Sequence, residues 1–189
     1  MTSSASTVAR SFTVADFDFP LPPELIAQHP APERSASRLL DGTGTAPVDR
    51  VFRELPTLLR DGDLLVFNDT QVVKARLFGQ KASGGQLEML IERVLLPHEA
   101  MDGTAHEVVA HLRVSKKPQP GGRLHMAGGV TAGGFDAVFL GRWPDEQGQL
   151  FRFRLHGPAG ETPYELMARH GHVPLPPYIT HADEADDER

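Results

Sequence analysis

The region from residue 72 to about residue 155 constrains the fold of this chain more than any other. Gly- and Pro-marked turns divide it about every eight to twelve residues, a spacing typical of short antiparallel strands. Between the turns apolar and polar residues alternate, most strictly in residues 151–155. Phe151 and Phe153 could stack on nucleic-acid bases there, but the alternation favours a place in a core. We expect an antiparallel, barrel-like β domain in this region.

The residues at the start of this region predict a buried strand followed by a hairpin. Residues 64–67 form a continuous apolar run, which predicts a strand buried on both faces, and a polar corner follows at residues 68–70. A second strand is predicted over residues 72–78, where Lys74 and Arg76 share one face because they are two residues apart. A Ser-Gly-Gly turn then joins it to a third, alternating strand.

Helical signals lie on both sides of the predicted barrel. Residues 22–28 predict a short helix, and residues 52–59 predict an amphipathic helix leading into the buried strand. Residues 161–171 form the best-marked helix, with a Thr-x-x-Glu capping box, a proline at its first position and a terminal glycine. His170 and His172 lie at its end without a third ligand nearby, so we expect no metal site.

These patterns together predict an α/β fold class, in which a mixed α/β domain, incomplete in this chain, carries an inserted antiparallel β-barrel domain. Helix followed by buried strand is typical of α/β layers. The expected parts are a disordered leader at residues 1–11, the first part of the α/β domain at 12–70, the inserted barrel-like domain at 71–156, and a truncated return to the α/β domain at 157–189.

The composition excludes several classes of protein. The 189 residues include no cysteine, which excludes disulfides, thiolate catalysis and cysteine-ligated zinc. No apolar run is long enough for a membrane span, and the N-terminus lacks the charged start and apolar core of a secretory signal. We therefore expect a cytoplasmic protein that does not enter membranes.

The charge distribution bears on nucleic-acid binding. The net charge of −6 argues against a protein that coats nucleic acid generally, because such binding depends on neutralising phosphates. Cationic residues nevertheless gather in the middle of the sequence, namely Lys74, Arg76, Lys81, Arg113, Lys116, Lys117 and Arg123. This asymmetry is compatible with a structured RNA that docks on one side.

Three polar segments each allow two interpretations. Residues 68–70, Asn-Asp-Thr, lie where open α/β sheets bind ligands, although these residue types also form ordinary turns, and spacing alone favours the turn. Arg34 and Arg38, with serines between them, could hold a phosphate or a carboxylate, or could lie in a solvated loop. Lys116 and Lys117 could present both charges to phosphates, or could serve solubility.

Four unusual segments carry a resemblance to a known family. They lie at residues 16–40, 62–93, 111–121 and 171–179, and include the sequences VFNDTQ, SKKPQPG and GHVPLPPYI. In this order they resemble the N-terminal part of the S-adenosylmethionine:tRNA ribosyltransferase-isomerases, the enzymes of queuosine synthesis. The chain departs from the family pattern at Gln71, where a basic residue is usual.

The resemblance implies a reaction. Members of this family move the ribosyl moiety of S-adenosylmethionine to 7-aminomethyl-7-deazaguanine at the tRNA wobble position, which gives epoxyqueuosine. S-adenosylmethionine is then a co-substrate, and the reaction needs no true cofactor and no metal, because the sulfonium makes methionine a good leaving group. It does need a base and a water-poor pocket.

The resemblance also suggests roles for individual residues. An acid is expected to contact the ribose or the substrate amine, polar neighbours and one aromatic ring are expected to bind the substrate, and cations are expected to face tRNA phosphates. In that order the candidates are Asp69 and Glu88 for catalysis; Asn68, Thr70 and Tyr178 for substrate binding; and Arg34, Arg76, Lys116 and Lys117 for RNA binding.

The partners implied are a tRNA carrying the 7-aminomethyl-7-deazaguanine base and S-adenosylmethionine, with no membrane, and we expect a monomer if the chain is complete. Because the resemblance covers only the N-terminal part of the family, an alternative stays open. The chain could be a truncated, catalytically incomplete RNA-binding fragment, since half of a site built across a cleft could be absent.

Overall fold

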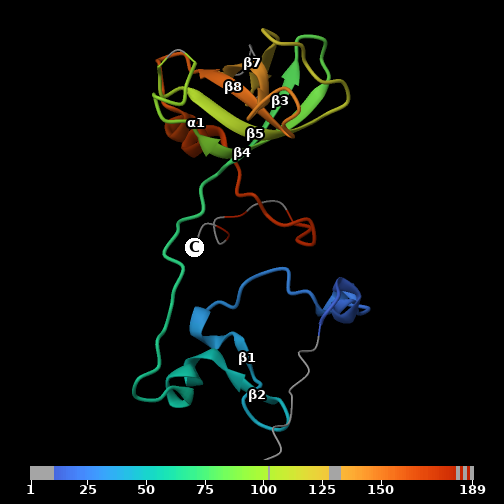
Figure 1. Cartoon of the computed structure of the whole chain (residues 1–189), viewed down its shortest axis with the longest axis vertical. Helices are drawn as coiled ribbons and strands as arrows, with labels where there is room; N and C mark the ends of the chain where they lie inside the picture. The colour runs from blue at the N-terminus through green and yellow to red at the C-terminus, as the bar shows by residue number, and fades with distance from the viewer. Residues whose placement is uncertain (1–10, 102, 128–132, 182–183, 185–186, 188–189) are drawn as a thin grey trace, which may run out of the picture. The chain divides into compact units, whose positions relative to one another are not determined.

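The computed structural model describes residues 11–101, 103–127, 133–181, 184 and 187. The chain divides into two compact units, Met1–Leu59 and Arg60–Arg189, whose positions relative to one another are not determined (Figure 1). Nearly all of the expected leader, residues 1–10, lies outside the described residues. No helix within the described ranges is both long and apolar enough to span a membrane.

The first unit contains short 3-10 helices and one hairpin. The helices are η1 (Val14–Phe17), η2 (Pro23–Leu25), η3 (Arg34–Ala36) and η4 (Phe52–Leu58), and the hairpin pairs β1 (Arg38–Asp41) with β2 (Val48–Val51). The helices expected at residues 22–28 and 52–59 are therefore only η2 and η4. Pro56 lies inside η4, and a proline in a helix interior removes a backbone hydrogen bond that an α-helix needs.

The hairpin is held together by Asp41, a buried carboxylate at the end of β1. Its oxygens accept hydrogen bonds from the Thr43 hydroxyl at 2.6 Å, the Thr43 backbone N–H at 3.0 Å and Arg50 Nε at 2.9 Å. These contacts, those of Thr43 first, lower the pKa of Asp41 to about 2. The turn between the two strands is thus fixed by an ionised side chain.

The expected buried strand at residues 64–67 is wrong. Residues 63–75 contain no strand, and Leu64, Val66 and Phe67 are 87, 86 and 76% exposed. A strand buried on both faces needs a neighbouring strand on each edge and a layer on each face. Within the described part of the chain no strand pairs with this segment, so its apolar pattern alone does not make a strand.

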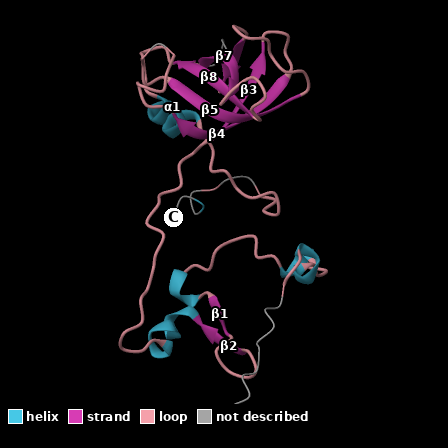
Figure 2. Cartoon of the chain, viewed as in Figure 1, coloured by secondary structure: helices cyan, strands magenta, loops and turns pink. Residues whose placement is uncertain are grey.

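The second unit is a closed antiparallel barrel, and the expected barrel-like domain is confirmed. Its strands are β3 (Arg76–Lys81), β4 (Gln86–Val94), β5 (Glu107–Val114), β6 (Arg123–Met126), β7 (Phe135–Trp143) and β8 (Leu150–His156), in the order β3-β4-β5-β8-β7-β6 (Figure 2). The pairing of β3 with β6 closes it. Gly79 permits this approach, because a Cβ there would lie 2.5 Å from the His125 carbonyl oxygen.

The barrel core is built from alternate residues of each strand. On β4, Leu87, Met89 and Ile91 are buried, as the sequence alternation predicts. Phe151 and Phe153 are 5 and 0% exposed, which confirms that they belong to the core and do not form open stacking surfaces. The strand expected at residues 72–78 begins only at Arg76.

The predicted C-terminal helix is confirmed as α1 (Pro163–His170), which lies beside the barrel (Figure 1). Thr162 and Glu165 form the predicted capping box. Leu166 and Met167 are buried in the barrel's apolar cluster. The described residues are thus mostly β, with a single α-helix, so the mixed α/β layer that the sequence led us to expect is present only in this limited form.

Candidate functional site

Phe78 lies on the outer face of the barrel, where it lines two cavities. It is the third residue of β3, and its side chain is on the outer face because Leu77 and Gly79 on either side of it are buried. Its partner in β4 is Glu88, and the partner of Glu88 in β5 is Arg113. Residues directly opposite one another on a sheet have contacting side chains, so an aromatic ring, an acid and a cation form one row across three strands.

Glu88 connects two arginines in this row. Its Oε1 lies 3.1 Å from Arg76 Nε, and its Oε2 lies 3.9 Å from a terminal nitrogen of Arg113. The Arg76 guanidinium also donates to the Leu175 carbonyl at 3.1 Å. Arg76 therefore fixes the orientation of Glu88 and ties the Pro-rich segment after α1 to the barrel.

Two adjoining cavities open on either side of Phe78. They have volumes of about 490 and about 370 Å³, within the range of small-ligand sites. Phe78 and Gln86 line both. The larger cavity is also lined by Leu87, Glu88, Arg113, Val114 and Ser115, and the smaller by Gly79, Gln80, Ala127, His170 and His172.

The segment after α1 contributes His172 to this surface. The His172 ring contacts the Phe78 ring edge-on, with 5.1 Å between ring centroids. Backbone hydrogen bonds from His172 N to Arg76 O, at 2.8 Å, and from Arg76 N to His172 O, at 3.2 Å, attach it to the start of β3. The Phe78 ring is therefore held in place on one side by a second aromatic ring.

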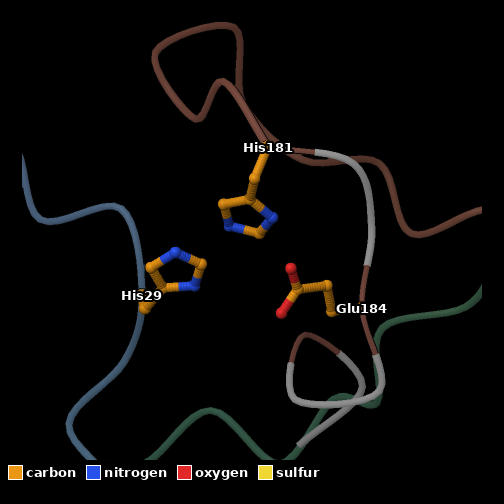
Figure 3. A group of neighbouring side chains, drawn as sticks. All are labelled: His29, His181 and Glu184. Carbon is orange, nitrogen blue, oxygen red and sulfur yellow. The ribbon is translucent and has the colours of Figure 1, made fainter.

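Candidate metal ligands do not define a site in this structure. Figure 3 shows His29, His181 and Glu184, whose side chains are of types that bind metal ions. His29 belongs to the first unit and the other two residues to the second, and the two units are not placed relative to one another. We therefore assign no metal to these residues, and the absence of a metal cofactor stays a prediction.

Among the predicted site residues that the structure describes, Glu88 and Arg76 come together across two strands, and Asn68 and Thr70 contact each other within one turn. At the polar corner, Asn68 Oδ1 accepts hydrogen bonds from the Thr70 backbone N–H at 2.9 Å and from its hydroxyl at 2.7 Å. This is the local bonding of an ordinary turn. Asp69 is exposed, Tyr178 is 56% exposed, and neither lines the two cavities. Their roles stay predictions.

The predicted RNA-binding cations lie in different surroundings. Arg34 is exposed on η3 in the first unit. Lys116 and Lys117 are exposed after β5, and Lys117 Nζ lies 5.3 Å from the centroid of the Phe151 ring. Arg76 is only 27% exposed and is engaged by Glu88, so the geometry gives it a positioning role. Contact of these residues with RNA stays a prediction.

Sequence reasoning did not assign Phe78 to a site, and it named Arg113 only as one of the cations in the middle of the sequence. A signal for Phe78 was present, because it lies two residues beyond Arg76 and therefore on the same strand face as Lys74 and Arg76. An aromatic residue on a cationic outer face is unusual for a side chain that serves only the core. The contact of Arg113 with Glu88 could be found only from the pairing of β4 with β5, which the sequence does not specify.

Comparison with known proteins identifies the family. A family described as "Queuosine biosynthesis protein" matches residues 14–189, so the chain belongs to this family. Curated relatives named S-adenosylmethionine:tRNA ribosyltransferase-isomerase occur in Dechloromonas aromatica, at 48% identity over 178 residues, and in Burkholderia cenocepacia, at 50% over 183 residues. Each alignment covers 94% of this chain but only 46% and 45% of the relative. The chain thus spans about half the length of these relatives.

Proposed function

We propose that this chain acts in the transfer and isomerisation of the ribosyl moiety of S-adenosylmethionine onto 7-aminomethyl-7-deazaguanine at the wobble position of a tRNA, to give epoxyqueuosine with release of adenine and methionine. The observation that carries the proposal is the family match over residues 14–189, together with relatives of that printed activity at about half identity. The partners are then tRNA and S-adenosylmethionine. We expect a monomer if the chain is complete, and a cytoplasmic location, where the tRNA substrate is found.

The Phe78 surface offers groups that suit this chemistry. Glu88 lines a cavity of about 490 Å³, and its two arginine partners hold the carboxylate in place. In the proposal it contacts the ribose or the substrate amine, and the aromatic ring of its direct partner on β3, Phe78, lines the same cavity. Asp69 is the second candidate acid. Of the two, Glu88 has the geometric support, because it lines the larger cavity beside Phe78 and Asp69 lines neither of the two cavities there.

The proposed chemistry requires no metal or redox cofactor. A sulfonium acidifies the adjacent carbon and leaves as a neutral thioether, so a positioned base and exclusion of water are the main demands on the protein. S-adenosylmethionine is consumed as a co-substrate. Glu88 supplies a positioned carboxylate as the candidate base, and Arg113 places a cation at the open edge of the cavity.

The proposal is tested by label transfer. The protein is incubated with a tRNA carrying the precursor base and with S-adenosylmethionine labelled either in the ribosyl moiety or in the methyl group. We expect ribosyl label in the tRNA and no methyl label. Bound tRNA without ribosyl label would contradict the proposal and would support the alternative of an RNA-binding fragment. Glu88→Gln should lower transfer by about 100-fold if the acid takes part in proton transfer.

A further inference from the structure

We propose that the outer barrel face around Phe78 binds a single-stranded RNA segment, with one base stacked on Phe78 and the neighbouring phosphates contacted by Arg113, Lys116 and Lys81. The inference rests on the proposed function, because it names the surface on which the tRNA substrate docks. It goes further by assigning that role to an aromatic residue and to two cations, Arg113 and Lys81, that neither the family match nor the relatives' names assign.

Phe78 has the properties of a stacking platform. Its side chain is 46% exposed although it lies in the middle of a strand, and most barrel aromatics, such as Phe139 and Phe153, are buried. His172 supports its ring from the edge. A cavity opens on each side of it, so an inserted base would meet a fixed aromatic surface with space beside it.

The cations lie where the phosphates of such a strand would run. Arg113 borders the larger cavity with a side chain that is 90% exposed. Ser115 lines the same cavity, Lys116 follows it, and Lys81 Nζ donates to the Lys116 carbonyl at 3.2 Å. Arg76 and Arg113 pair with the carboxylate of Glu88. Lys81 and Lys116 add two further cations, which are linked to each other by the bond from Lys81 Nζ. This positive surface contrasts with the chain's net charge of −6.

The cavity walls also carry neutral groups that can bond to a base edge. Gln80 and Gln86 are paired across β3 and β4 on the same face as Phe78, and both line the smaller cavity. Ser115 supplies a hydroxyl in the larger cavity. Amide and hydroxyl groups beside an aromatic platform are the means by which proteins recognise unstacked bases in single-stranded RNA.

An RNA strand fits this surface better than a peptide does. Exposed aromatic surface, amide groups and cations in one place match a ligand that carries flat bases and regular negative charge. An acidic peptide would satisfy the cations but would leave the two cavities beside the ring without a planar ligand. A double helix would satisfy the cations, but its bases are stacked and could not reach Phe78.

The first test measures binding of a fluorescent single-stranded RNA of about 12 nucleotides, a length within the usual site size, to the protein without S-adenosylmethionine. Phe78→Ala should weaken binding by about 5- to 150-fold, which is the usual loss for one stacked base. Phe78→Leu should weaken it similarly while keeping apolar bulk, and Phe78→Trp should restore it. Leu96→Ala, at an exposed apolar residue beyond the opposite end of β4, should leave binding unchanged.

The second test measures the dependence of binding on salt. For single strands, the slope of log K against log salt should fall by about 0.7 for each phosphate contact removed. Arg113→Gln and Lys116→Gln should each show this loss. Arg93→Gln is the matched control. Arg93, on β4, is an exposed cation like Arg113 and Lys116, but it does not line either cavity.

The outcomes separate this inference from the proposed function. RNA binding that depends on Phe78, in a protein that transfers no ribosyl label, would support the inference and contradict the proposed function. Wild-type affinity in both Phe78→Ala and Phe78→Leu, or no RNA binding at any salt concentration, would overturn the inference. Wild-type RNA affinity in these variants with loss of binding to another protein would show that a protein partner covers Phe78, and would overturn it as well.

Discussion

Glu107 shows how one residue organises a surface of this barrel. It is fully buried, although it lies on β5 among apolar neighbours. Its two carboxylate oxygens accept hydrogen bonds from Arg152 Nε at 2.6 Å and from the Arg154 guanidinium at 2.7 Å. A third bond, from the Met101 backbone N–H at 3.2 Å, ties the β4–β5 loop to the same acid. A buried charge is tolerated here because both carboxylate oxygens accept hydrogen bonds.

We predict that Glu107→Gln destabilises the protein by about 2–4 kcal/mol, because it leaves two arginines beside a neutral amide. The loss is toward the low end for broken buried ion pairs, because both arginines are partly exposed. Urea denaturation measures the change. Glu92→Gln is the control, since Glu92 is 41% exposed and its ion pair is 4.0 Å long, and it should change stability by less than about 0.5 kcal/mol. Equal effects of the two substitutions would contradict the assigned role of Glu107.

A second prediction at this scale concerns the pH dependence of the hairpin in the first unit. The pKa of Asp41 lies at about 2, below its ordinary value of 3.8, chiefly because the Thr43 hydroxyl donates to the carboxylate. A lowered pKa in the folded state means that the stabilisation is present above about pH 4 and is lost as the pH falls through 2. The stability of the hairpin should therefore be constant from neutral pH to about 4.

Titration of the Asp41 carboxyl by NMR checks this. The midpoint should be near 2 and should rise toward 3.8 in Thr43→Val. Thr57→Val is the matched control, because the Thr57 hydroxyl donates to the Glu54 carbonyl in the same unit and does not contact a carboxylate. A wild-type midpoint near 3.8 would show that the Thr43 contacts do not persist in solution.

The site could be predicted from the sequence only one residue at a time. Glu88 and Arg76 were identified separately, as an acid and as a cation on a strand face, but their contact depends on the register of β3 against β4. Pairing of this kind is set by the turn and by the packed face. Arg113 depends on a further register, between β4 and β5. Contacts between side chains on different strands therefore cannot be predicted from the sequence of one strand.

At the scale of elements, local patterns succeeded where the partners are neighbours in sequence. The strands β4 and β8 alternate buried and more exposed residues, and each pairs with the strand that precedes it in the sequence, β3 and β7, so alternation was a sufficient signal. Helix α1 was marked by its own cap. Residues 64–67 failed because burial on both faces depends on partners that the local pattern cannot specify.

The exposure of residues 64–67 gives a prediction for hydrogen exchange. Their backbone amides have no strand partner within the described residues, so they should exchange at nearly the rate of an unstructured peptide. The amides of Leu87, Met89 and Ile91 in β4 should be strongly protected, because they lie between β3 and β5. Amide exchange followed by mass spectrometry measures both. Protection of residues 64–67 equal to that of β4 would show that they form a strand in solution.

At the scale of the whole molecule, the barrel supplies a rigid frame for the Phe78 surface. β3, β4 and β5 contribute the row of Phe78, Glu88 and Arg113, and α1 leads to His172, which holds the ring. Sites built on strands are held more firmly than sites on loops. The polar corner at residues 68–70, which the family resemblance suggested as a substrate site, lies in an exposed segment.

The most direct test of this account identifies the nucleoside that receives the label. After reaction with ribosyl-labelled S-adenosylmethionine, the tRNA is digested, and its nucleosides are separated and identified by mass spectrometry. The account predicts that the precursor nucleoside, 7-aminomethyl-7-deazaguanosine, disappears and that the label is recovered in epoxyqueuosine. An unchanged precursor, or label in any other nucleoside, would contradict it.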